Sequence, residues 1–107
     1  MSGHDLGPLF AALADDTRRE ILGQLASHGD QSATRLAERL PVSRQAVVKH
    51  LAALEAVGTV QRIRRGREVL FRVDPRPLRV AARWFERTAH DWDARLEALK
   101  QAAEVGE

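Results

Sequence analysis

The chain has 107 residues, of which 44% are apolar, a formal net charge of +2 and no cysteine. That length predicts one domain over residues 1–107, and the lack of cysteine excludes disulfides, thiol redox chemistry and thiolate metal ligands. No apolar run approaches the roughly 20 residues that span a bilayer, and no secretory segment opens the sequence. We therefore expect a cytoplasmic protein without a membrane partner.

Two helices are predicted before residue 30. The first, over residues 6–14, has an apolar stripe that consists of Leu6, Leu9, Phe10 and Leu13. The second is predicted over residues 16–27, and its inward-facing apolar residues are Ile21, Leu22 and Leu25. Either Asp15 caps the start of this second helix, or Thr17 and Glu20 form a capping box there.

Residues 32–58 predict a short helix, a tight turn and another helix. The apolar residues of the short helix recur at helical spacing and are Ala33, Leu36, Ala37 and Leu40. Pro41 ends that helix, because proline lacks an N–H and disfavours the helical conformation at the residue before it. Ser43 stands where its hydroxyl can cap the next helix, whose inward-facing residues are Val47, Leu51 and Leu54. Gly58 is expected to close it.

The later of these two helices has a polar face near its N-terminus, as in a DNA-binding helix-turn-helix. An ordinary helical hairpin with solvated charges is the alternative interpretation. Gln45 is the best candidate for reading a base edge, because an amide can pair bidentately with adenine, whereas Arg44 could contact guanine or a phosphate. His50 is expected to be a structural histidine rather than a phosphate contact. The candidate DNA-binding residues of this helix are Ser43, Arg44, Gln45, Val48, Lys49 and His50.

A β-hairpin is predicted directly after the helix-turn-helix. Residues 60–63 and 69–73 are rich in strand-forming side chains, and Gly66 between them tolerates the positive φ that a tight hairpin turn requires. A hairpin with an arginine-rich tip beside such a helix is typical of a wing, which reaches phosphates or the minor groove. The candidate DNA-binding residues of the wing are Arg62, Arg64, Arg65, Gly66 and Arg67.

A long C-terminal helix is predicted from Leu78 to about residue 103. Two interleaved heptads of apolar residues form a seam along it, and they consist of Leu78, Phe85, Trp92 and Leu99, and of Ala82, Ala89, Leu96 and Ala103. The seam could pack on the chain's own domain. However, such a helix spans roughly 39 Å at about 1.5 Å per residue, which is longer than so small a domain can cover, so we expect a partner chain to cover the rest.

Three segments of the chain occur in a recognisable order and spacing. They are the run LADDTRREIL at residues 13–22, the pair of Leu36-Ala37-Glu38 and Val42-Ser43, and residues 47–54. Together they resemble the ArsR/SmtB family of winged-helix repressors, over about residues 5–100. One departure is Asp16, where family members usually carry proline, but an aspartate suits a first helical turn through the helix dipole.

The resemblance implies a mostly helical winged helix-turn-helix with a small hairpin, in the order α-α-α-α-β-β-α. It also implies a homodimer that binds an imperfect palindrome and represses transcription until an effector loosens it. The terminal helices, residues 5–14 and 78–104, would then form the dimer interface. The residues expected there are Leu6, Leu9, Phe10, Leu13, Leu78, Ala82, Phe85, Ala89, Trp92, Leu96 and Leu99.

Many family members sense metals, but neither recognised type of metal site is intact in this sequence. Residues 31–36, where one site of the family carries cysteines, contain no soft ligand. His90 and Asp93 resemble half of another site, but Pro77 and Arg79 stand where its other half would be. Half a ligand set is usually a surface ion pair, so we expect no metal and no cofactor. The effector, if one exists, is unknown; a small apolar ligand between the helices would suit a chain without thiols.

The sequence favours a DNA-binding transcriptional regulator and no enzyme. Asp91, Asp93 and Glu97 are explained by a charged, solvated helix face, because no nucleophile or glycine-rich loop accompanies them. The expected partners are double-stranded DNA and a second copy of the chain. The alternative is a winged-helix module for protein–protein contact, in which the basic face meets an acidic partner. A regulator discriminates between DNA sequences at fixed salt and such a module does not.

Overall fold

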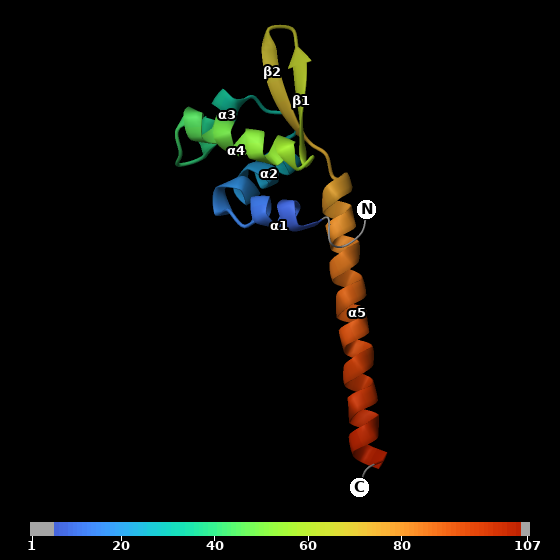
Figure 1. Ribbon diagram of the computed structural model, residues 1–107. Helices are drawn as coiled ribbons and strands as arrows, with labels where there is room; N and C mark the ends of the chain where they lie inside the picture. Colours follow the sequence, from blue (N-terminus) through green and yellow to red (C-terminus); the bar gives the residue numbers. More distant parts are fainter. Residues whose placement is uncertain (1–5, 106–107) are drawn as a thin grey trace.

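The computed structural model describes residues 6–105, and these form five helices and one β-hairpin (Figure 1). In chain order they are α1 (Gly7–Leu13), α2 (Asp16–His28), α3 (Ala33–Arg39), α4 (Arg44–Ala56), β1 (Val60–Arg65), β2 (Glu68–Val73) and α5 (Arg76–Val105). The predicted fold class and element order are confirmed. Residue 5, which we assigned to the first dimerisation helix, lies outside the described residues.

Side-chain caps determine where three of the helices begin. Oδ1 of Asp15 accepts a hydrogen bond from the backbone N–H of Arg18 at 3.0 Å, so the first of the two predicted caps of α2 is the one that forms. The hydroxyls of Ser32 and Ser43 each accept from the N–H three residues later, at 3.1 Å, and cap α3 and α4. Each cap satisfies one of the N–H groups that a helix start leaves without a partner.

The wing has a tighter turn than the sequence suggested. β1 and β2 pair antiparallel, and Arg65 lies opposite Glu68 at the end of the ladder. Gly66 has a φ of 63°, which lets Gly66 and Arg67 alone connect the strands. Arg64 and Arg65 therefore belong to β1 rather than to a loop, so the strands carry arginines almost to the tip.

A single apolar core joins α2, α3, α4 and the base of the wing. Its most deeply buried members are Ile21, Leu36, Val47, Leu51 and Leu54, which were predicted to face inward. The connection between α2 and α3 is tied to the wing by two backbone hydrogen bonds, from Gln31 N to Phe71 O at 3.2 Å and from Phe71 N to Gln31 O at 2.8 Å. The wing is therefore held in a defined position beside α3 and α4.

Helix α5 extends away from the rest of the domain (Figure 1). It has 30 residues and spans about 45 Å at roughly 1.5 Å per residue. Only its first turns contact α1, through buried Ala81 and half-buried Trp84, and residues 85–105 are exposed. The radius of gyration is 19.3 Å, whereas a compact domain of this size has about 13 Å. None of the helices in residues 6–105 combines the length and apolar composition that crossing a bilayer requires.

Asp74 joins the wing to α5. Its carboxylate accepts hydrogen bonds from the backbone N–H of Arg76 at 3.1 Å, from Nη2 of Arg76 at 2.6 Å and from Nε2 of Gln61 at 3.1 Å. These bonds, above all those from Arg76, lower the pKa of Asp74 to about 2, from an ordinary value near 4. The backbone N–H of Asp74 also donates to the carbonyl of Thr59 at 2.8 Å, so the direction in which α5 leaves the wing depends on this residue.

The lowered pKa of Asp74 predicts an acid-sensitive junction. Because the carboxylate is favoured in the folded state, its stabilising contribution is fully present above about pH 4 and is lost as the pH falls from about 4 to about 2. We expect this from urea unfolding curves measured at several pH values in this range. As the pH falls, the free energy of unfolding of Asp74→Asn should decrease less than that of the wild type. If the two proteins lost stability equally with falling pH, these hydrogen bonds would not favour the ionised carboxylate.

Candidate DNA-binding surface

The N-terminal half of α4 presents a polar face to solvent. Arg44, Gln45 and Lys49 are exposed, and Val48 between them is 40% exposed. The opposite face of α4 lies in the core, so the helix is anchored on one side and free on the other. A helix held in this way can enter a major groove and bring its first turns to the base edges.

Two of the predicted contact residues on α4 already have partners in the chain. Nε of Arg44 donates to Oγ1 of Thr34 at 3.0 Å, which aligns the guanidinium along the N-terminal end of α3. Nδ1 of half-buried His50 accepts from Nε of Arg18 at 3.2 Å; since a guanidinium only donates, the ring proton of His50 lies on Nε2. This bond links α4 to α2 and agrees with the structural role expected for His50.

Carboxylates neutralise part of the basic charge of the wing. Arg62 forms a two-point ion pair with Glu55 of α4, with Nη2 at 3.0 Å from Oε1 and Nε at 3.3 Å from Oε2, and this pairing raises the pKa of Arg62. Asp30 pairs with Arg72 through two hydrogen bonds of 3.0 and 2.7 Å and lies 3.8 Å from Arg65. From the sequence, all the wing arginines were equivalent candidates for contacting DNA. In the structure, Arg62 and Arg65 have counter-ions within the chain.

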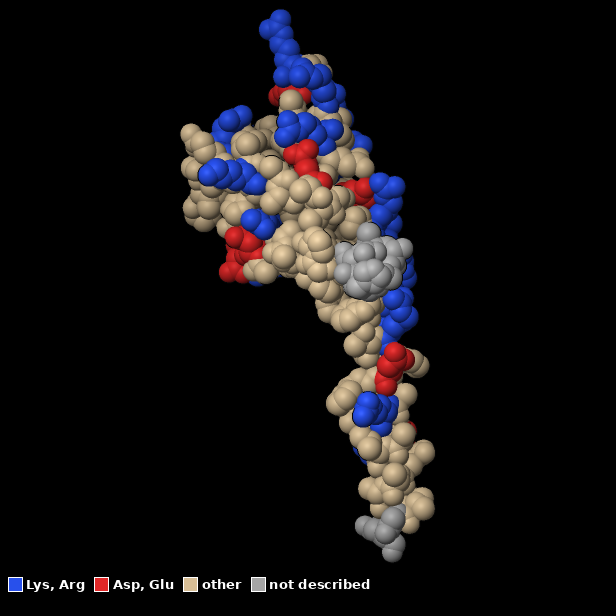
Figure 2. All heavy atoms as spheres, in the orientation of Figure 1, with Lys and Arg blue, Asp and Glu red and all other residues tan. Residues whose placement is uncertain are grey.

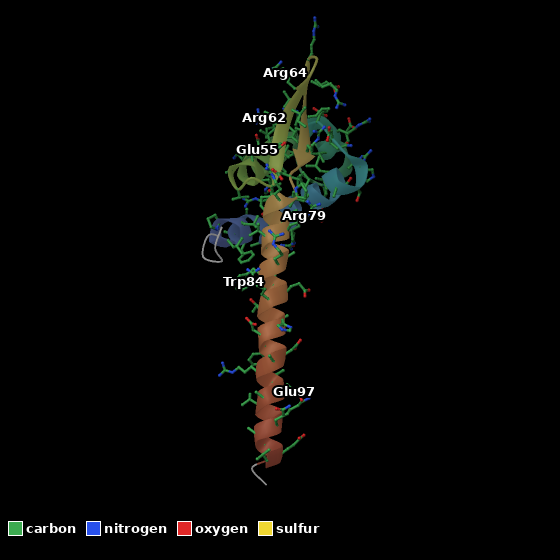
Figure 3. The ribbon with its side chains drawn as sticks, turned by 90° about the vertical axis from the view of Figure 1, so that its right-hand side faces the viewer. Glu55, Arg62, Arg64, Arg79, Trp84 and Glu97 are labelled. Carbon is green, nitrogen blue, oxygen red and sulfur yellow. The ribbon has the colours of Figure 1, made fainter. Side chains whose placement is uncertain are left out.

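Arg64 and Arg67 differ from these residues, because no ion pair is recorded for either of them within residues 6–105. Figure 3 shows Arg64 near the tip of the wing and Arg62 lower on the hairpin, beside Glu55. In Figure 2, basic side chains gather around the tip of the wing. Arg64 and Arg67 are therefore the wing residues with the most uncompensated charge for a phosphate.

A groove of about 690 Å³ runs between α4 and the wing. Arg44 and Val48 line it from α4, and Arg62 and Arg67 line it from the wing. The two surfaces that the sequence assigned to DNA are thus neighbours. The bases of one DNA duplex could therefore contact α4 while the phosphate backbone of the same duplex contacts the wing.

The apolar seam of α5 is exposed to solvent in the single chain. Phe85, Trp92 and Leu99 are 56–57% exposed and Leu96 is 39% exposed. Exposed apolar side chains in a continuous row mark an interaction surface, and no other part of residues 6–105 covers this one.

The structure changes the part that α1 can play in a dimer interface. Leu6 and Leu9, both predicted interface residues, are only 1% and 4% exposed because they pack against α5 of the same chain. Their side chains have no surface left for a partner, so they are removed from the candidate interface. Phe10 and Leu13 are half-buried, and the ring of Phe10 lies 5.4 Å from that of Phe85, beside the seam.

Several contacts of this surface were not predicted. Trp84 could have been recognised, because Val80, Ala81 and Trp84 recur at helical spacing on a face separate from the seam. The pairing of Asp30 with Arg72 joins residues 42 positions apart, and no sequence pattern indicates it. The same holds for Arg18 and His50, which are 32 positions apart.

The half metal site suggested by His90 and Asp93 lies on the exposed part of α5. Within residues 6–105, no three His, Cys, Asp or Glu side chains are close enough together to hold a metal ion.

Comparison with known proteins gives matches over most of the chain. Residues 13–60 match the helix-turn-helix domain family. The uncharacterised HTH-type transcriptional regulator YuzN of Bacillus subtilis is 37% identical over 75 residues, which cover 63% of this chain and 82% of YuzN. An ArsR-like transcriptional regulator from Rhodococcus sp. RHA1 has 51% identity and a TM-score of 0.90, covering 97% of this chain and 94% of that one.

A more distant solved structure shares the fold. The homodimeric winged helix-turn-helix DNA-binding domain of Mb0332 from Mycobacterium bovis has 24% identity and a TM-score of 0.65. The match covers 80% of this chain and 78% of that one.

Proposed function

The chain belongs to the ArsR family of winged helix-turn-helix transcriptional regulators, and on this premise we propose that it is a homodimeric repressor that binds an imperfect palindrome in a promoter. The observation that carries the proposal is the groove that the polar face of α4 and the arginines of the wing line together. This arrangement supports simultaneous reading of base edges and of the flanking backbone.

We assign the base contacts to α4 and the backbone contacts to the wing. Gln45 is exposed near the start of α4 and can pair with an adenine, and Arg44 and Lys49 flank it for a guanine or a phosphate. Ser43 caps the helix and lies close enough to its end to meet a phosphate. From the wing, Arg64 and Arg67 supply phosphate or minor-groove contacts.

We propose that the dimer forms along the seam of α5. The exposure of Phe85, Trp92 and Leu99 supports this assignment, as does the homodimeric state of the Mycobacterium bovis domain of the same fold. A second copy can cover the row of apolar residues that the domain leaves in water, and burying such residues is the main driving force of association. Phe10 would extend the interface onto α1, since its ring adjoins Phe85.

The side-chain volumes along the seam favour an antiparallel pair of α5 helices. In a parallel pair each residue meets its own copy, so Trp92 would stack on Trp92 while Ala89 faced Ala89. Overfilled layers would then alternate with empty ones, and both are unfavourable in a packed interface. In an antiparallel pair centred between residues 90 and 91, the facing residues are Leu78 with Ala103, Ala82 with Leu99, Phe85 with Leu96, and Ala89 with Trp92.

This antiparallel pairing also sets a useful distance between the two domains. The two copies of Val80, which lie where α5 meets its domain, would be about 32 Å apart along the helix axis at roughly 1.5 Å per residue. Half-sites of a palindrome lie about one DNA turn, roughly 34 Å, apart. The length of α5 therefore suits two recognition helices that enter successive major grooves on one side of the DNA.

The proposal is tested by selecting binding sites for the purified full chain from a random DNA library at fixed salt. We expect enrichment of an inverted repeat whose halves are centred about one turn apart, and the same motif should lie in the promoter that the protein represses. Retention of the library without enrichment of any sequence would contradict the proposal and favour a protein-contact module, because phosphate contacts alone carry no sequence information.

A further inference from the structure

The groove between α4 and the wing combines an apolar surface with an excess of positive charge. Its volume, about 690 Å³, lies within the range of about 300–1,000 Å³ that small-molecule sites occupy. The apolar part of the lining is formed by Ala33, Val48, Val69 and Phe71. The charged part consists of Arg44, Arg62, Arg67 and Glu68. Because Glu55 neutralises Arg62, the excess charge comes from Arg44 and Arg67, which face the single anion Glu68.

The three arginines of this groove differ in how far their guanidinium groups already bind other side chains of the chain. Arg62 is paired with Glu55, and its guanidinium carbon lies 5.3 Å from the centre of the Phe71 ring, so its planar group forms a flat wall of the groove. Arg44 uses Nε for Thr34, and Arg67 has no ion pair recorded within residues 6–105. Two guanidinium groups can therefore turn towards a ligand, one from each side of the groove, while the third provides a surface for stacking.

Phosphodiester binding alone does not explain the apolar part of this groove. A phosphate is bound by cations, hydroxyls and backbone N–H groups. Val48 is 40% exposed in the middle of a polar helix face, and together with Val69 it gives the groove an apolar surface. A flat apolar body on Val48 and the Arg62 wall, with an anionic group between Arg44 and Arg67, would use both parts of the lining.

We propose that this groove is a regulatory site for an aromatic carboxylate, and that its occupation excludes DNA. The exclusion rests on the function proposed above, because Arg44 and Arg67 would bind either the ligand carboxylate or the DNA, but not both. Binding that is mutually exclusive in this way lowers the affinity for DNA and for the ligand reciprocally. The site would thus release the repressor without a metal or a thiol.

The first test is direct binding to the full-length protein without DNA, followed by NMR of the 15N-labelled chain. The probe is 2-naphthoate, compared with neutral 2-naphthalenemethanol and with dimethyl phosphate, an anion without an aromatic body. We expect saturable shifts of the amide signals of Val48, Val69 and Phe71 with naphthoate, and at least tenfold weaker binding of the other two probes. If dimethyl phosphate bound as tightly as naphthoate, the groove would be a DNA backbone contact and the proposal would be wrong.

Two wing arginines provide a matched pair for the second test. Arg67 lines the groove, whereas Arg64 lies on the same hairpin outside its lining. Arg67→Ala should weaken naphthoate binding about tenfold, as expected for the loss of one charge-assisted hydrogen bond, and Arg64→Ala should leave it unchanged. Equal effects of the two substitutions would overturn the site.

The third test is competition with DNA. Saturating naphthoate should lower the affinity of the wild type for its selected DNA at least tenfold, and an unchanged affinity would overturn the regulatory role. The repressor function and the ligand site can be refuted independently of each other. If the protein selects no DNA sequence, the repressor function is wrong, whereas the NMR titration tests ligand binding in the groove in either case.

Discussion

Leu96→Glu is expected to convert the protein into a monomer and to abolish its binding to a palindrome, although every side chain assigned to DNA stays intact. In the antiparallel pairing, Leu96 faces the partner's Phe85, and the two-fold axis repeats this contact. The substitution would therefore bury two carboxylates against aromatic rings, and each unpaired buried charge costs several kcal/mol. Sedimentation velocity at micromolar concentration measures the dimer, and fluorescence anisotropy with the selected DNA measures binding.

A matched control for this variant is Ala94→Glu. Ala94 is exposed and lies on the side of α5 opposite the seam, so the same charge on the same helix should leave both the dimer and DNA binding as in the wild type. Trp92→Ala should weaken dimerisation by about 3–5 kcal/mol if the ring is buried as deeply as a core residue. A Leu96→Glu protein that remained dimeric at micromolar concentration would rule out the seam as the interface.

The orientation of the two helices can be tested separately, because the chain has no cysteine. Under oxidising conditions, a mixture of Ala82→Cys and Leu99→Cys proteins should form a disulfide-linked heterodimer, since these positions face one another in the antiparallel pair. Neither variant alone should cross-link, because a disulfide needs Cα atoms within about 7 Å. Efficient cross-linking of Ala82→Cys with itself would indicate a parallel dimer.

Gln45→Ala is expected to relax the sequence preference at one base position in each half-site. The loss of a bidentate contact between an amide and an adenine should remove about 1–3 kcal/mol of discrimination at that position, with little change in salt dependence. Competition between the selected DNA and single-base variants, at fixed salt, measures this effect. The physical reason is that an uncharged side chain at a base edge distinguishes bases but releases no counterions.

The wing arginines should behave differently from Gln45. Arg64→Ala and Arg67→Ala should weaken binding to all sequences alike and reduce the slope of log K against log salt by about one. Arg62→Ala should have a smaller effect, because Glu55 already neutralises that charge. If Gln45→Ala and Arg64→Ala had indistinguishable effects on specificity and on the salt slope, the assignment of bases to α4 and of backbone to the wing would be wrong.

The local features of the fold could be predicted because their causes lie within a few residues of one another. Asp15, Ser32 and Ser43 cap helices through the N–H three residues later, and Gly58 and Gly66 adopt the positive φ values that their positions require. Apolar spacing of 3.6 or 2 residues then indicates which face of each element is buried. The winged helix-turn-helix, its element order and the exposed polar face of α4 follow from these signals.

Features that depend on how distant elements meet were decided by the tertiary structure. The neutralisation of Arg62 and Arg65 requires Glu55 and Asp30 to lie beside the hairpin, and the burial of Leu6 and Leu9 requires α1 to dock on the first turns of α5. The sequence by itself determined that α5 carries an apolar seam too long for its own domain. Only the tertiary structure docked the Trp84 face of α5 on α1 and opened a groove between α4 and the wing. The physical reason is that a local pattern sets which side of an element is apolar, whereas the partner of each side depends on packing across the whole chain.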